Sequence, residues 1–391
     1  MNNRSNWKRR ITKLPRKLAK PTCFANTLFY LFWTLLIVGK GFGMTANNRP
    51  MRILTWIGIS LAILKMAVEK WKKNELIISM ALIVAGILVY VFSQDAAVLL
   101  TVIVICGTKG IDLHFLFKYS FWIRLILFLS VSTLAIFNVI DRELLIRYDS
   151  GNVHTIRYAL GYGHPNATHY TLFSICVLLF LSYSYNKIWL YCILELYNYF
   201  IFSYTDSRTG FIMTSFLIVF MYVARKKYFE SAMLKASPLL CNTYIVLATV
   251  SIMIPILIQY LFGFKKYGTM YSRFTTGLRV MQNYNLRLFG QPGINTDFGY
   301  VFIAYAYGVV VLALFIIINT SLMRFFIAEH RYTEFVILLS YSIYTLMESY
   351  SASVLMNISL LMSSILVYES TRRMYMRKDI YDSKEFVTSR E

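Results

Sequence analysis

Long apolar stretches recur from Phe24 to Val367, and they constrain the fold more than any other feature of the chain. A helix needs about 20 apolar residues to cross a bilayer. Charged residues make up only 15% of the chain, whereas soluble domains carry roughly 25%. The sequence therefore predicts an all-α polytopic membrane helix bundle. It excludes a soluble enzyme, a disordered chain and a nucleic-acid-binding module.

Hydropathy predicts about twelve transmembrane helices in a single transmembrane domain, residues 24–368. The predicted spans are 24–43, 53–68, 75–93, 96–111, 119–140, 167–185, 188–205, 209–224, 239–262, 298–319, 333–347 and 351–368. The fourth is the weakest because it is short and contains Gly107 and Gly110. A basic N-terminus (1–23) and a tail (369–391) flank the domain, and no small-residue cleavage site suggests a signal peptide.

The formal charge of +21 is mostly a matter of topology. If both termini are cytoplasmic, most of the 40 Lys and Arg residues fall on the cytoplasmic side, as the positive-inside rule requires. We therefore expect a multi-pass protein of the cell membrane. Most exterior basic residues are arginines: Arg49, Arg52, Arg142, Arg147, Arg157, Arg208, Arg273, Arg279 and Arg287. A phosphate ligand would favour arginine over lysine, and chance composition is the alternative.

Two predicted exterior loops are long, 141–166 and 263–297. Long loops in compact folds usually carry function. In the second loop, Tyr271–Phe289 could form an amphipathic helix at the membrane surface. The alternative is a simple cap over the bundle.

The first exterior motif runs from Arg157 to Asn166. Pro165 would begin the sixth span, with Asn166 or Thr168 as its cap. His164 would then lie at the membrane–water boundary, where it could accept a proton or bind an oxyanion. The alternatives are a structural turn or a role for His169 one turn further along.

The second motif is the short turn Thr205–Gly210. Asp206 and Ser207 are good caps for the eighth span, and Arg208 lies in its first turn. A cation there opposes the helix dipole, so we expect an anion nearby. Either Asp206 or a bound phosphate could supply it.

The third motif begins at Arg273, continues through the Gly290–Gly293 turn and ends at Asp297–Tyr300. The turn would direct the chain back into the membrane. Asp297 is expected to cap the tenth span or to pair with an exterior arginine. Elsewhere, Glu195 is expected to make a structural contact with neighbouring tyrosines. None of the five cysteines lies in CxxC spacing and no HExxH occurs, so neither a metal nor a cofactor is expected.

These three motifs resemble those of the Wzy-type polysaccharide polymerases of the O-antigen ligase/polymerase superfamily. Arg157–Asn166 is similar to an Arg-x-x-Leu-Gly-Phe-x-His-Pro-Asn pattern, with Tyr162 in place of Phe. Ser207–Gly210 matches Ser-Arg-Thr-Gly. Arg273, Leu288–Gly290, Asp297 and Tyr300 follow in the family's order, and Gly308 matches a glycine usual in the next helix.

The resemblance implies a GT-C-like membrane glycosyltransferase. It would polymerise undecaprenyl-pyrophosphate-linked oligosaccharides into capsular or exopolysaccharide on the outer face of the cytoplasmic membrane, without a nucleotide sugar. Its catalytic residues would be His164, Arg208 and Arg273, and its substrate-binding residues Arg157, Asn166, Arg279, Arg287 and Asp297. Implied partners are the bilayer, the lipid-linked donor, and the flippase and chain-length regulator of the same pathway.

Three rival functions remain open. A ligase would share the donor and differ only in the acceptor. A flippase for lipid-linked oligosaccharides would carry charges along a central cavity. A secondary transporter would show related halves and broken midplane helices.

Overall fold

The computed structural model describes residues 23–45, 48–149, 152–184, 187–262 and 268–376, so most of the two predicted cytoplasmic tails lies outside the described residues. The described chain is mostly helical. Six of its helices are long and apolar enough to cross a membrane. These are Phe24–Gly41, Arg49–Val68, Lys73–Ser93, Leu113–Ile136, Thr243–Leu261 and Val309–Ala328.

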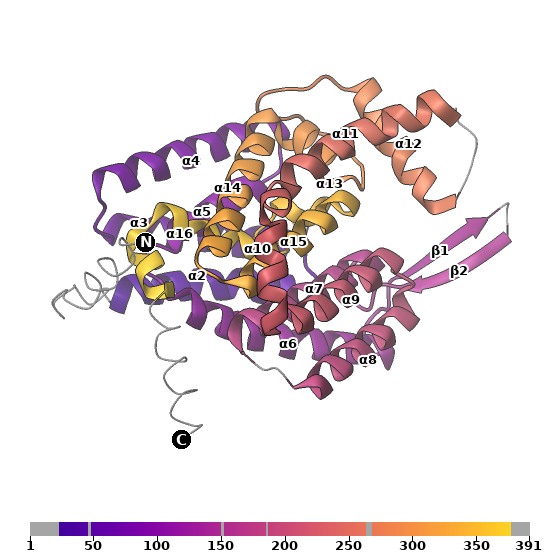
Figure 1. The fold of residues 1–391 in the computed structure, drawn as a ribbon, viewed down its shortest axis with the longest axis horizontal. Helices are drawn as coiled ribbons and strands as arrows, with labels where there is room; N and C mark the ends of the chain where they lie inside the picture. Colours follow the sequence, from indigo (N-terminus) through magenta and orange to yellow (C-terminus); the bar gives the residue numbers. More distant parts are fainter. Residues whose placement is uncertain (1–22, 46–47, 150–151, 185–186, 263–267, 377–391) are drawn as a thin grey trace.

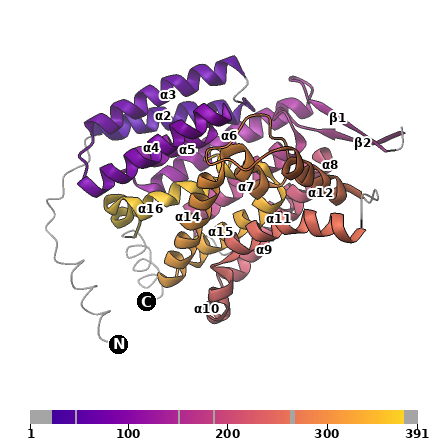
Figure 2. The same cartoon turned by 90° about the horizontal axis from the view of Figure 1, so that it is seen from above.

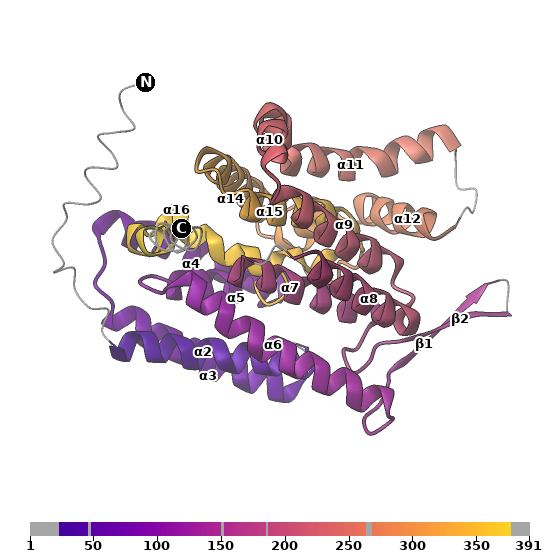
Figure 3. The same cartoon turned by 60° about the horizontal axis from the view of Figure 1, so that its bottom comes forward.

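The helices stack in layers around one large apolar core. The first half contains α2 (Cys23–Gly41), α3 (Arg49–Val68), α4 (Lys73–Ser93), α5 (Ala97–Gly107), α6 (Leu113–Ile136) and α7 (Pro165–Ser182). The second contains α8 (Ile188–Thr205), α9 (Arg208–Ala224), α10 (Lys227–Leu240), α11 (Thr243–Phe262), α12 (Gly268–Asn283), α13 (Gly299–Phe302), α14 (Val309–Ala328), α15 (Tyr332–Met347) and α16 (Ser364–Val367). Figure 3 shows the stack from α2 and α3 through α6 and α7 to α15 and α11.

Helix α7 lies at the centre of the stack, and almost all of its side chains are buried. It packs against α6 on one side and against α8, α9 and α15 on the other. A helix that is apolar on every face is stable only when neighbours surround it. Its N-terminus is therefore held firmly, and it is a rigid base for the first motif.

The predicted exterior loop 141–166 contains an antiparallel hairpin, so the all-α prediction is wrong for this segment. Strand β1 (Leu144–Asp149) pairs with β2 (Asn152–Tyr158), with Leu145 opposite Arg157. Both strands carry branched and aromatic residues that favour extended backbone, but they are too short and too polar to resemble an apolar span. The hairpin lies at the same end of the molecule as α12, with α16 at the other end (Figures 1 and 2). We call the first end the hairpin end.

The predicted tenth span is broken rather than continuous. Helix α13 passes into a π-helical turn, η1 (Ile303–Tyr307), and Gly308 with φ +95° separates it from α14. A Cβ on Gly308 would lie 2.2 Å from the carbonyl oxygen of Leu288. The motif turn at Leu288–Gly290 thus packs backbone to backbone against the break, with Gln291 N donating to Ala306 O at 3.1 Å.

The predicted twelfth span is also not one helix. Two 3₁₀ turns, η2 (Ser349–Ala352) and η3 (Ile358–Ser363), lie where the single helix was expected, and α16 is a single turn. Carbonyls at membrane depth need partners inside the protein. Side chains provide them here: Thr101 bonds Ala352 O, Arg124 bonds Leu355 O, and Ser174 bonds Met356 O. Arg124 therefore supports the unwound segment.

The predicted amphipathic helix exists as α12, and its apolar face contacts protein. Val280 belongs to a small apolar cluster with Phe298 and Val301 of the chain around α13. Gly277 also approaches the Phe298 ring. This packing favours the cap interpretation over a helix that offers its apolar face to lipid.

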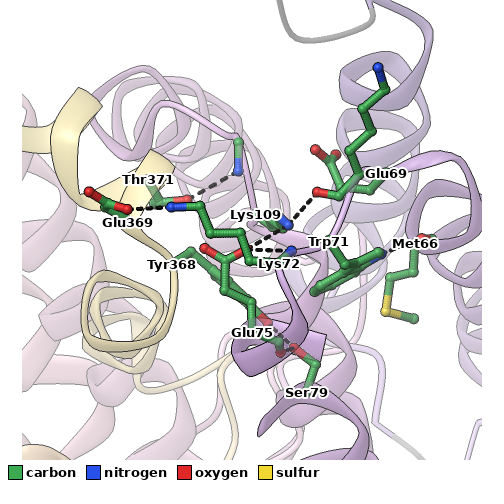
Figure 4. Close-up of polar contacts among 12 residues, drawn as sticks. Met66, Glu69, Trp71, Lys72, Glu75, Ser79, Lys109, Tyr368, Glu369 and Thr371 are labelled. Carbon is green, nitrogen blue, oxygen red and sulfur yellow. Dashed lines mark hydrogen bonds and ion pairs between the residues drawn. The ribbon is translucent and has the colours of Figure 1, made fainter. Parts of the chain in front are cut away.

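A set of paired charges lies near α16, at the end of the molecule opposite the hairpin (Figure 1), and Figure 4 shows its contacts. We call it the lysine cluster; it comprises Lys65, Glu69, Lys72, Glu75, Lys109 and Glu369. Each buried lysine has its own carboxylate: Lys65 pairs with Glu69 at 2.9 Å and Lys109 with Glu75 at 2.7 Å. The exposed Lys72 shares Glu369 with Arg373. Lys65 and Lys109 are buried, so these two cations contribute to tertiary structure as well as to charge topology.

Candidate functional site

The three sequence motifs converge at the hairpin end. We call their meeting point the hairpin-end cluster, which comprises Arg157, Asn166, Ser207, Arg273, Asp297 and Glu348. Its members come from β2, α7, the turn between α8 and α9, α12, the segment before α13, and the end of α15. Four of them were predicted as site residues: Arg157, Asn166, Arg273 and Asp297.

The Asn166 side chain connects the two halves of the cluster. Its Oδ1 accepts hydrogen bonds from Arg157 at 2.9 Å and from the Ser207 hydroxyl at 3.1 Å. Its Nδ2 donates to Glu348 Oε1 at 2.9 Å. Two donors on the carbonyl side and a carboxylate on the amino side define the orientation of this amide.

Arg273 is buried and engaged on all three guanidinium nitrogens. Nη2 donates to Glu348 Oε1 at 3.1 Å, Nη1 donates to the carbonyl of Met347 at 2.8 Å, and Nε lies 3.7 Å from Asp297 Oδ2. Asp297 is the exposed partner, and Glu348 is only 2% exposed. The predicted pairing of Asp297 with an arginine is confirmed, and the partner is Arg273. Its predicted capping role is wrong, because Phe298 occupies the N-cap position of α13.

Glu348 lies between two predicted spans, where burial raises its pKa to about 7, and the positive charge of Arg273 opposes that rise. A carboxylic acid with this pKa changes its charge near neutral pH. The cluster therefore holds one buried group whose ionisation is sensitive to physiological pH.

His164 is itself the N-cap of α7, so the predicted Asn166 or Thr168 cap is wrong. Its Nδ1 accepts the backbone N–H of Asn166 at 3.1 Å. Burial and the nearby Arg157 lower its pKa, which favours the neutral ring. In that tautomer Nε2 carries the hydrogen and can only donate. This geometry suits the oxyanion-binding alternative better than the proton-accepting one.

Arg208 is the accessible cation beside the cluster. It is the first residue of α9, its side chain is 64% exposed, and its Nε lies 3.5 Å from Asp206 Oδ1. The expected Ser207 cap does not form, since the hydroxyl donates to Asn166 instead. The α9 N-terminus therefore presents N–H groups next to Arg208, a combination that attracts anions.

Gly210 allows this turn to approach the centre of the bundle. A Cβ at Gly210 would lie 2.3 Å from Cβ of His169. His169 is fully buried, with Thr205 Oγ1 2.8 Å from Nδ1 and Asn198 Oδ1 3.2 Å from Nε2. Both ring nitrogens are thus engaged in packing α7 against α8, which favours a structural role.

Three other predicted residues lie outside the cluster. Arg279 and Arg287 are exposed, and no contact joins either side chain to the cluster in the described part of the chain. Glu195 makes a structural contact, as expected. Its partners are Asn198, in the same helix α8, and Ser215 of α9, rather than the neighbouring tyrosines.

Two cluster residues were not predicted as site residues: Ser207 was expected only as a helix cap, and Glu348 lies outside the three motifs. Glu348 occupies the C-cap of α15, where a carboxylate faces the negative end of the helix dipole. The same reasoning selected Arg208, a cation at a helix N-terminus. Applied to acids at C-termini, it would have selected Glu348.

Among the described residues, no group of three or more His, Cys, Asp or Glu side chains could hold a metal ion. Comparisons with protein-family models, with curated proteins and with solved structures find no match for the chain. Fold and site therefore define a helical protein with several helices that could cross a membrane and an arginine-rich cluster at one end.

Proposed function

We propose that the chain is a membrane glycosyltransferase of the Wzy polymerase type, with about twelve spans. It would join undecaprenyl-pyrophosphate-linked repeat units on the outer face of the cytoplasmic membrane. The observation that carries this proposal is the convergence at the hairpin end: three motifs far apart in sequence meet through Asn166 and Glu348, beside the exposed Arg208.

In this reaction an acceptor hydroxyl oxygen attacks the anomeric carbon of the donor. The bond between that carbon and the pyrophosphate oxygen breaks, and its electron pair leaves with the pyrophosphate. The hydroxyl proton passes to solvent. Negative charge grows on the leaving group, and fixed cations stabilise it most effectively when they are already in place.

The cluster suggests a role for each predicted residue. Arg208 is the first phosphate ligand, because it is exposed and only weakly paired. His164 donates through Nε2 to a phosphate oxygen. Arg157 and Arg273 supply positive potential from inside the protein. Asp297 is the exposed partner of Arg273, and the bound anion displaces it from that ion pair.

The broken helices favour a second candidate, a transporter for lipid-linked oligosaccharides. Discontinuous helices are typical of transporter binding sites, and the chain has breaks at Gly308 and across η2 and η3. The two candidates differ in chemistry, because a transporter makes no new glycosidic bond.

The experiment expresses Arg208→Ala and Arg273→Ala in a strain that lacks the native protein. For a polymerase, long glycan disappears while single repeat units accumulate on lipid at the outer face. Accumulation at the inner face would indicate the transporter, and long polymer in both variants would exclude the proposal. Loss of polymer with short units still attached to the cell separates polymerase from ligase. Arg52→Ala is the matched control, since Arg52 is an exposed cation of α3 outside the cluster.

A further inference from the structure

Glu348 occupies an unusual place among the charges of the protein. One buried carboxylate oxygen, Oε1, accepts hydrogen bonds from Arg273 at 3.1 Å and from Asn166 at 2.9 Å. Through Asn166 Oδ1 the same group is connected to Arg157, whose guanidinium donates at 2.9 Å. Glu348 therefore organises two arginines, one directly and one through an amide.

The two arginines come from segments that are far apart in the sequence. Arg157 is on the hairpin and Arg273 on α12, more than a hundred residues apart. Two guanidinium groups repel each other, and the repulsion strengthens where burial removes water. A carboxylate between them offsets that repulsion, and the amide of Asn166 transmits the orientation.

We propose that Glu348 is the positioning residue of the hairpin-end cluster: it holds Arg273 directly and Arg157 through Asn166, so that both cations face one anionic ligand. The identity of that ligand as a pyrophosphate rests on the proposed function. The holding of the two arginines is a separate claim and can be tested without any glycan.

The ionised form of Glu348 does the holding, although burial disfavours it. Burial raises the pKa of Glu348 to about 7, Arg273 and Arg157 oppose the rise, and Asp297 adds to it. The tyrosines of α7, α15 and η2 that face it are Tyr170, Tyr344 and Tyr350. Because the pKa in the folded state exceeds the ordinary value, this group stabilises the fold at low pH, and that contribution is lost as pH rises through about 7.

Glu348→Gln separates positioning from structure. The amide keeps the size of the side chain and an oxygen that can accept from Arg273 and Asn166, but it carries no charge. We expect the variant to match the wild type in thermal stability at pH 5 and to exceed it at pH 8. The variant is therefore expected to fold, so a change in arginine labelling reports positioning rather than unfolding.

Arginine labelling tests the holding directly. Purified protein in detergent at pH 8 is treated with phenylglyoxal, and peptide mass spectrometry gives the extent of modification at Arg273 and Arg157. Arg273 is protected in the wild type, and we expect its labelling to rise several-fold in Glu348→Gln. Asn166→Ala is the second variant and should raise labelling at Arg157 more than at Arg273. Asp141→Asn, an exposed acid of the same end, is the control and should change neither.

The outcomes distinguish this inference from the proposed function. Unchanged Arg273 labelling in Glu348→Gln would overturn the positioning role. A different outcome would refute only the ligand. Arginine labelling would still rise in Glu348→Gln, but inorganic pyrophosphate would not protect the wild-type arginines from phenylglyoxal and the wild type would make no polymer. The positioning role would then remain. If the positioning role and the pyrophosphate ligand are both correct, the activity of the wild type rises as pH increases through about 7. The activity of Glu348→Gln should not show this rise.

Discussion

The two ends of the molecule both contain networks of charged side chains, yet the networks are built differently. In the lysine cluster each buried lysine has its own carboxylate, and further contacts lie within the cluster: Lys109 donates to Lys70 O at 2.5 Å and lies over the Trp71 ring. In the hairpin-end cluster Arg273 contacts the buried Glu348 and the exposed Asp297, and Arg157 is connected to the same Glu348 through Asn166. Arg208 next to them faces solvent.

The difference shows how to distinguish a structural network from a binding site. When every buried cation is paired with its own carboxylate, no positive charge remains for a ligand to bind. Such pairing neutralises charge within the fold. Shared pairing beside an exposed cation leaves residual positive potential, which an anion can satisfy. Charge balance around each cation is thus more informative than the number of charges.

The largest expected effect is on stability at the lysine cluster. Lys109→Met leaves the buried Glu75 without its partner. Removing one member of a buried pair costs about 3–5 kcal/mol. Denaturation in detergent should show this loss, and the polymer made per folded molecule should not change. Adding Glu75→Leu should recover much of the stability; a double variant as unstable as the single one would contradict the pairing.

The next effect is on activity at the hairpin end. Arg208→Ala should reduce polymer formation about 10²-fold or more, the usual consequence of losing one fixed group that stabilises developing charge. Because Arg208 is exposed, its thermal unfolding should stay close to that of the wild type. Turnover and melting temperature, measured on one preparation, would show whether Arg208 affects activity without affecting stability. A large loss of stability with normal turnover would reverse the comparison.

Arg208→Lys should have an intermediate effect, about tenfold, because an ammonium group keeps the charge and loses the planar fork. Measuring kcat and KM for the lipid-linked donor would locate the defect. Full activity would show that Arg208 acts as a point charge.

The smallest effect is expected for Asp206→Asn. The pair with Arg208 is long, 3.5 Å, and partly exposed, so its removal should change stability by less than about 1 kcal/mol. Donor affinity should rise slightly, since the ligand no longer competes with Asp206. Weaker donor binding would indicate that Asp206 itself orients Arg208.

Much of the fold could be read from the sequence because the hydrophobic pattern records burial. The apolar helices were predictable, and so was the entry of α7 at Pro165. The breaks were not, because hydropathy does not report backbone hydrogen bonding. Gly308 breaks its span through a backbone contact with Leu288, twenty residues earlier in the chain.

The candidate site was partly predictable for a similar reason. Arg208 carried a local signal, a cation at a helix N-terminus. Glu348 belongs to the cluster through Arg273 and Asn166, which are 75 and 182 residues away, and these contacts exist only in the folded chain. The sequence likewise does not show which ring nitrogen of His164 caps α7; in the folded chain it is Nδ1.

The most direct test uses the purified chain in proteoliposomes with a synthetic undecaprenyl-pyrophosphate-linked repeat unit as the sole substrate, and mass spectrometry of the products. The expected result is glycan of two or more repeat units together with free undecaprenyl pyrophosphate, both absent with Arg208→Ala. Donor that crosses the bilayer without forming a new glycosidic bond, or donor that remains unchanged, would contradict the proposed polymerase.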